Sequence, residues 1–162
     1  MDVELARWRG YQVGHSLNMI AELPAHVDDP QTPKALRHAA VDAFFIHVRL
    51  LRDFLIEKNS RAIGWRDYTT GFNLPPALRK PLAGPIDVAG REVAHFNKQG
   101  RAPDTSTPVH HAMAAADLRP HAEAVFAAME AFVRHLAAEP EPCVYTADFD
   151  GWLRDARRLA AQ

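Results

Sequence analysis

Apolar residues recur along most of this chain every three or four positions, the spacing that places side chains on one face of an α-helix. Alanine is abundant, β-branched residues are sparse, and no stretch alternates between apolar and polar residues as a half-buried strand does. The periodic stretches predict helices over residues 3–23, 33–57, 84–98, 118–138 and 147–160. The sequence therefore predicts an all-α protein, a four- to five-helix up-and-down bundle.

Proline, glycine and capping residues set the predicted ends of these helices. Pro24 is expected to end the first helix, because a proline inside a helix removes a backbone hydrogen bond. Thr32 and Asp117 are expected to cap the second and fourth helices. A long loop that is irregular or holds short helices is expected between helices two and three, over residues 65–80, because turn-forming residues interrupt that stretch: Gly71, Pro75, Pro76 and Pro81.

Length and composition narrow the class of protein. A chain of 162 residues fits one domain, residues 1–162, with one hydrophobic core. The net charge of −1 argues against coating nucleic acid by bulk charge, although it leaves room for a local basic patch. No apolar run approaches the ~18 residues that span a bilayer, and the acidic N-terminus does not resemble a signal peptide. We therefore expect a cytoplasmic protein that does not enter a membrane.

The sequence carries no motif for a common cofactor. Cys143 is the only cysteine, which excludes an intrachain disulfide and a cysteine-based zinc site. There is no glycine-rich phosphate loop, no G-x-S-x-G element and no G-x-G-x-x-G element. No bound cofactor is expected from these patterns.

The predicted helix over residues 33–57 carries polar residues where a core helix does not need them. His47 falls inside its apolar stripe, which fits either a core histidine bonded to another helix or a functional site. Arg49 and Asp53 form an i,i+4 pair on the far side, which fits either a solvated ion pair or part of that site. Phe45, Ile46 and Leu50 flank Arg49 with a second apolar surface, which indicates a central bundle helix or a dimer interface.

The predicted helix over residues 84–98 places an arginine and a histidine one turn apart. Arg91 and His95 share its polar face. An arginine can bind phosphate oxygens in bidentate fashion and a histidine can move a proton near neutral pH, so the pair suits work on phosphodiesters. The alternative is a solvated face with ordinary ion pairs.

A metal site is a second possibility for the histidines. Glu92-x-x-His95 resembles half of a carboxylate-bridged di-iron site, but the sequence has no second such pair and no H-E-x-x-H. His110 and His111 could join His15 or His47 around a metal ion. In the loop between helices two and three, Trp65-Arg66-Asp67-Tyr68 either covers a cleft, with Asp67 as a binding residue, or pins the loop to the bundle.

Three stretches of the chain carry a family resemblance: AFFIHVRLLRDFL, RAIGWRDY and REVAHFNKQGR. Over about residues 36–101 they resemble a group of small bacterial helical proteins that is similar to the HEPN superfamily of helical bundles. The resemblance implies an α-bundle, a homodimer, and a polar site near His47, Arg49, Asp53, Arg91 and His95. In ribonuclease members the signature is an arginine, four to six residues and a histidine, whereas three residues separate Arg91 from His95.

Three functions fit these residues. In the first, a HEPN-like homodimer binds nucleotide or RNA, with His47, Asp53 and Asp67 as binding residues. If this dimer cleaves RNA, His95 transfers the proton and Arg91 or Arg49 holds the phosphate. In the second, a metal-dependent bundle enzyme uses His47, His95 and His110 or His111. In the third, the chain is a non-catalytic dimeric interaction module.

Overall fold

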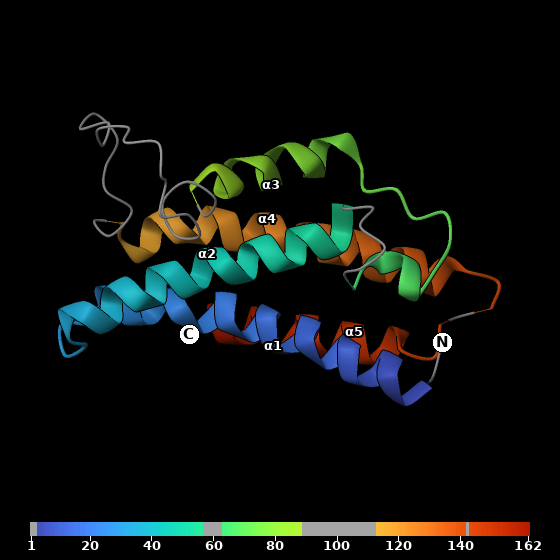
Figure 1. Cartoon of the computed structure of the whole chain (residues 1–162), viewed down its shortest axis with the longest axis horizontal. Helices are drawn as coiled ribbons and strands as arrows, with labels where there is room; N and C mark the ends of the chain where they lie inside the picture. Colours follow the sequence, from blue (N-terminus) through green and yellow to red (C-terminus); the bar gives the residue numbers. More distant parts are fainter. Residues whose placement is uncertain (1–2, 57–62, 89–112, 142) are drawn as a thin grey trace, which may run out of the picture.

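The computed structural model describes residues 3–56, 63–88, 113–141 and 143–162, and within them the chain is all-α (Figure 1). The helices are α1 (Val3–Asp28), α2 (Lys34–Ile56), α3 (Pro76–Val88), α4 (Ala115–Ala138) and α5 (Thr146–Ala160), with a short 3-10 helix, η1 (Trp65–Asp67), before α3. No strand occurs in the described ranges. The predicted fold class is thus confirmed. None of these helices combines the length and the apolar character needed to cross a bilayer.

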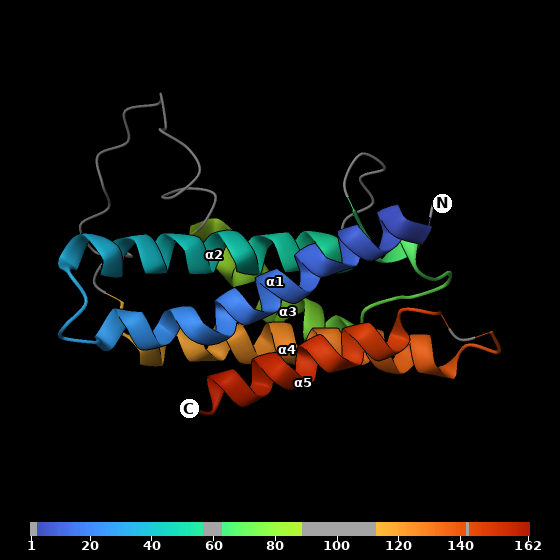
Figure 2. The same ribbon diagram turned by 90° about the horizontal axis from the view of Figure 1, so that it is seen from below.

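The helices pack as a bundle in which α4 has the most helix neighbours, and α1 and α2 each pack on three other helices. α1 runs obliquely across the bundle and packs on α2, α4 and α5 (Figure 2). α4 contacts all of the other four helices. α3 covers α2 and α4 on the side away from α1 and α5 (Figure 1). Among the described helices, none covers the remaining face of the α1–α2 hairpin.

A tight turn joins α1 to α2 and fixes the hairpin. The carboxylate of Asp29 accepts hydrogen bonds from the Gln31 N–H at 2.8 Å and from the Thr32 hydroxyl at 2.7 Å. These two bonds, in that order, are the main reason why the pKa of Asp29 lies below its ordinary value. Thr32, predicted as a helix cap, therefore uses its hydroxyl within the turn. The Pro33 carbonyl accepts hydrogen bonds from the N–H groups of Leu36 and Arg37 at the start of α2.

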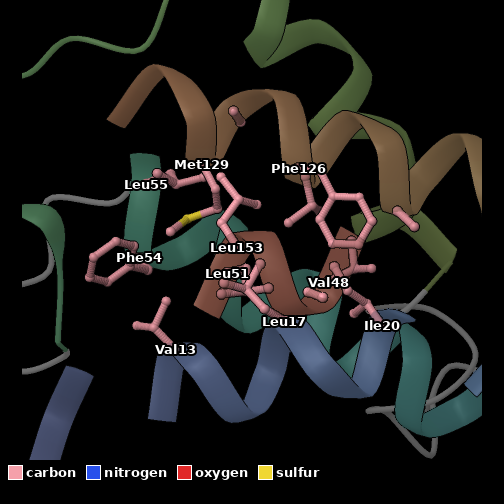
Figure 3. Close-up of a cluster of buried hydrophobic side chains, with 14 of the residues drawn as sticks. Val13, Leu17, Ile20, Val48, Leu51, Phe54, Leu55, Phe126, Met129 and Leu153 are labelled. Atoms are coloured by element: carbon pink, nitrogen blue, oxygen red, sulfur yellow. The ribbon is translucent and has the colours of Figure 1, made fainter. Parts of the chain in front are cut away.

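All five described helices contribute side chains to the core, and Figure 3 shows a cluster of them. Its labelled side chains come from α1 (Val13, Leu17, Ile20), α2 (Val48, Leu51, Phe54, Leu55), α4 (Phe126, Met129) and α5 (Leu153). Beside them lies a cluster of aromatic rings. The centroid of the Phe149 ring of α5 lies 4.9 Å from that of Tyr68 and 5.3 Å from that of Phe132, in edge-to-face contacts. The cluster fastens the segment after η1 to the bundle, as the pinning interpretation of that loop predicts.

Helix α1 continues past Pro24, so the prediction that it ends there is wrong. Proline has no N–H to donate to the carbonyl one turn earlier, a loss of about 3 kcal/mol or more in a helix interior. Here Leu23 and Val27 are only 9% and 7% exposed, and Pro24 itself is buried. Burial of this last turn against the core offsets the missing hydrogen bond, and α1 reaches Asp28.

Helix α3 begins earlier than the sequence indicated. Residues 76–80, predicted as irregular or as short helices, form its first turns, because Pro76 stands where the N–H has no partner in the helix anyway. Pro81, expected to interrupt this stretch, lies inside α3, so that expectation is wrong. The Pro75 carbonyl accepts from the N–H groups of Leu78 and Arg79 and starts the helix. Of the predicted helix over residues 84–98, the first part, 84–88, belongs to α3, and 89–98 lie outside the described residues.

Helix α4 also begins earlier, at Ala115 rather than residue 118. Asp117 is its third residue, not its cap, and accepts from the Ala114 N–H at 2.9 Å. The Ala115 N–H donates to Asp28 at the end of α1, at 3.1 Å. The start of α4 is thus capped partly by a carboxylate from another helix, which helical periodicity cannot reveal.

Candidate functional site

A cavity of about 330 Å³ opens between α1 and α2 on the outer face of their hairpin. Its walls are mostly apolar, and its polar side chains come from both helices. The described lining residues are Gln12, Val13, His15, Ser16, His47, Leu50, Leu51, Asp53, Phe54 and Ile63. Two of the predicted site residues, His47 and Asp53, are therefore brought to one cavity. This volume and this mixture of apolar walls and a few polar groups are typical of a small-molecule site.

His47 satisfies both interpretations of its place in the apolar stripe. Its Nδ1 lies 3.1 Å from the Ser16 hydroxyl of α1, so it is a half-buried histidine bonded to a neighbouring helix. It also faces the cavity, and its ring meets the ring of His15 edge-on at 5.4 Å. Burial first, and then the charge of His15, hold the pKa of His47 below its ordinary value. The imidazole is consequently neutral near pH 7, with Nε2 as its second hydrogen-bonding atom.

Two arginines hold the carboxylate of Asp53 at the edge of the cavity. Arg52 donates to Asp53 Oδ1 at 2.7 Å, and Arg49 Nε lies 3.7 Å from Oδ2. Arg49 is the more open of the two, with 43% of its side chain exposed against 23% for Arg52. The predicted i,i+4 pair therefore exists, at the rim of the cavity and facing solvent. Such an exposed pair contributes little to stability, but it places a cation beside the cavity.

Asp67 has a local role instead of lining the cavity. Its carboxylate accepts from the Gly64 N–H at 3.0 Å and closes the turn that starts η1. It is not among the described residues that line the cavity. This local bond, like the aromatic packing of Tyr68, fits the pinning interpretation of the loop.

The other predicted site residues fall outside the part of the chain that the structure describes. Arg91 and His95 lie there, as do His110 and His111 of the metal hypothesis. Among the described residues, no group of three or more His, Cys, Asp or Glu side chains is placed to hold a metal ion. His15 and His47 are neighbours, but two imidazoles without a third ligand do not make a zinc site.

Sequence reasoning missed Ser16, the polar partner of His47. Ser16 is 4% exposed and lies on the buried side of α1 between Val13 and Leu17. The available signal was a hydroxyl inside an apolar stripe, which requires a hydrogen-bond partner when it is buried. Serine is small and common on both faces of helices, so this signal is weak without knowledge of the neighbouring helix.

The Ser16–His47 pair resembles the start of a nucleophilic dyad but lacks the rest of an acyl-transfer site. A neutral imidazole beside a hydroxyl can accept its proton. Stabilising the oxyanion also needs N–H donors aimed at the reacting carbonyl. Ser16 lies in the middle of α1, where the backbone N–H groups are used by the helix. The pair is better suited to hydrogen bonding a ligand than to attacking one.

A second polar cluster, on the other side of the bundle, serves to anchor a loop. The Thr69 hydroxyl donates to Glu139, and His135 Nε2 lies 3.1 Å from that hydroxyl and 3.0 Å from the Thr70 carbonyl. All of these contacts join the segment after η1 to α4. Thr69 is only 7% exposed, whereas 31% of the His135 side chain and 23% of the Glu139 side chain are exposed.

Comparison of the chain with protein-family models, curated proteins and solved structures finds no match. The resemblance to HEPN bundles therefore stays a prediction from the sequence, and the function has to be argued from the α1–α2 cavity.

Proposed function

We propose that this chain is a cytoplasmic, homodimeric helical-bundle protein that binds nucleotide or RNA and receives a nucleobase in the α1–α2 cavity. The observation that carries the proposal is the cavity itself, an apolar hollow of about 330 Å³ with polar groups at its edge. A nucleobase has a flat apolar face and a rim of hydrogen-bonding atoms, so it matches such a lining.

The polar groups of the cavity suit a base better than a phosphate. His47 is neutral near pH 7 and offers one ring nitrogen beyond the one bonded to Ser16. Asp53 offers carboxylate oxygens that accept N–H groups from the edge of a base. The walls that Leu51 and Phe54 contribute would cover the face of the ring.

The phosphate of a bound nucleotide is assigned to the rim. Arg49 faces solvent beside Asp53 and can reach a phosphate while the base is in the cavity. Ribonuclease activity in this proposal depends on His95 for proton transfer and on Arg91 or Arg49 for the phosphate. If cleavage of RNA is unchanged in His95→Ala, the catalytic part of the proposal fails, although the binding part stands.

Binding is tested by titrating the protein with the four nucleoside monophosphates and with short single-stranded RNA in a calorimeter. We expect saturable binding that weakens about tenfold or more in Asp53→Asn, because a hydrogen bond to a charged acceptor is lost. Asp150→Asn is the matched control, since Asp150 also forms an exposed i,i+4 pair, with Arg154 at 3.2 Å, but on α5. Absence of binding to every nucleotide and RNA, or equal loss in both variants, would overturn the proposal.

A further inference from the structure

Helix α2 exposes an apolar stripe on the face that points away from the core. Leu36, Ile46 and Leu50 are 59%, 45% and 53% exposed, unusually open for large apolar side chains on a helix. With Ala39, which is exposed, and Ala43, which is half-buried, they recur at intervals of three and four residues. This is the heptad spacing of a helix that packs along another helix. We call these five residues the outer α2 stripe.

The outer α2 stripe is continuous with two hollows between α1 and α2. Leu50, at one end of the stripe, lines the α1–α2 cavity. Leu36 and Ala39, at the other end, line a second hollow of about 400 Å³, which also includes Leu23 and His26 of α1. A partner on the stripe would therefore cover both hollows.

Charges beside the stripe indicate how a second copy would lie on it. On one flank, Ala40 and His47 face α1, and Phe54 packs on the aromatic rings of the core, so that side is already occupied. The other flank carries Asp42, next to Ala43, and Arg49, next to Leu50. Between two antiparallel helices with heptad spacing, residues on the same flank meet in reverse order, so Asp42 of one copy faces the partner's Arg49. A twofold axis forms this contact twice. In a parallel pair, Asp42 and Arg49 would instead face the partner's other flank, which its own α1 already occupies.

We propose that a second copy of this chain packs on the outer α2 stripe with its α2 antiparallel. Ala43 then faces the partner's Ile46, and Leu50 faces the partner's Ala39. In the same register the partner's Leu36 lies opposite Asp53, at the edge of the α1–α2 cavity. Each copy therefore closes the cavity of the other and contributes an apolar residue to it. This last step rests on the proposed nucleobase site, whereas the dimer itself does not.

The test is charge exchange across the proposed interface, read by sedimentation velocity from about 1 to about 100 µM protein. We expect a dimer for the wild-type chain. Asp42→Arg and Arg49→Asp should each weaken association about tenfold or more, because each reverses two contacts in the symmetric dimer. The double variant, D42R with R49D, should restore association because it re-forms both pairs with the charges exchanged.

The matched control exchanges the charges of a similar pair elsewhere. D150R and R154D alter an exposed i,i+4 pair on α5, so they should leave association unchanged. Circular dichroism and thermal melting check that every variant is folded. A wild-type chain that stays monomeric across the range, or a double variant no better than the single ones, would overturn the proposal and leave the stripe to another partner.

A second variant separates the dimer from the ligand. Ile46→Glu places a charge in the centre of the stripe but outside the described lining of the cavity. We expect it to be monomeric and to bind nucleotide about tenfold or more weakly, because its cavity stays open. If it is monomeric and binds as the wild type does, closure of the cavity by the partner is wrong and the dimer stands. If the wild type dimerises but binds no nucleotide, the proposed function fails and the interface stands.

Discussion

The α4–α5 and α1–α2 walls of the bundle both bury large apolar side chains, but they differ in their outer surface and in the polar residues on their inner side. On the α4–α5 wall, large apolar residues such as Phe132 and Phe149 are fully buried, and the outside carries ion pairs. Arg157 pairs with Glu130 at 2.7 Å and Arg158 with Asp155 at 3.0 Å. On the α1–α2 wall, Ser16 and His47 lie inward, while Leu36, Ile46 and Leu50 face outward.

We interpret this difference as one between a wall that serves stability and a wall that also serves the proposed ligand and partner. The α4–α5 wall follows the ordinary rule for a helix that borders water, with the apolar face inside and charges outside. The α1–α2 wall breaks that rule twice, with a polar pair on its inner side, of which Ser16 is buried and His47 half-buried, and with an exposed apolar stripe. Departures of this kind concentrate at functional surfaces, because stability alone does not favour them.

Truncation of a core ring on the α4–α5 wall should lower the unfolding free energy most, whereas truncation of an exposed residue on the α1–α2 wall should change it little. Phe149→Ala removes a fully buried ring that contacts Phe132, Tyr68 and Trp152, so we expect a loss of about 3–5 kcal/mol of unfolding free energy. Leu50→Ala, on the outer stripe, should change the stability of the monomer by no more than about 0.5 kcal/mol. Urea titration at low protein concentration measures both. A large loss in Leu50→Ala would mean that the stripe already packs within one chain.

Two glycines give a smaller contrast between the walls. A Cβ added at Gly14 of α1 would lie 2.8 Å from the Trp152 indole of α5, so Gly14→Ala should destabilise the fold by about 1–3 kcal/mol. Gly151 of α5 has no neighbouring atom within 4 Å of such a Cβ, so Gly151→Ala should stabilise it by about 0.5–1 kcal/mol through helix propensity. Thermal melts of both variants decide this. Equal shifts would contradict the close packing of α1 on Trp152.

Acidification should weaken the fold through a histidine on each wall. Burial lowers the pKa values of His47, on α2, and His121, on α4, from the ordinary 6.5, so the unfolded chain binds protons more readily. The unfolding free energy that these two neutral histidines contribute is present above the ordinary pKa. It is lost as the pH falls through their lowered pKa values in the folded chain. Urea midpoints should therefore fall between about pH 7.5 and about pH 5. His47→Gln should reduce this dependence and leave the share of His121; an unchanged profile would show that His47 is not protected in the fold.

The sequence predicted the helices whose apolar period is unbroken, and it missed helix ends that depend on packing against other helices. The helices around Val48, Phe132 and Leu153 were found with ends within a few residues, because burial of one face dictates a period of 3.6. Pro24 and Pro76 were expected to lie at or beyond helix ends. Burial of the last turn of α1 overrides the first expectation, and the tolerance of a helix start for proline overrides the second.

The candidate site shows the same division between local and long-range information. His47 could be selected because a histidine in an apolar stripe stands out in a linear pattern. Its partner Ser16 is 31 positions away, and a helical period does not say which helices are neighbours. Asp67 was selected as a ligand, whereas its bond to Gly64 is a local turn contact of a type that spacing of three residues can reveal.

Truncation of an exposed arginine on each wall should have the smallest effect on stability but should distinguish the functions of the two walls. Arg49→Ala on α2 and Arg154→Ala on α5 each remove one side of an exposed i,i+4 pair, with N–O distances of 3.7 and 3.2 Å. Each should change unfolding free energy by no more than about 0.5 kcal/mol, because water solvates both partners in the folded and the unfolded chain. In nucleotide titration and sedimentation, however, only Arg49→Ala should weaken binding and association. If Arg154→Ala has the same effect in either experiment, the charges of the α1–α2 wall have no role that those of the α4–α5 wall lack, and the functional distinction between the walls is lost.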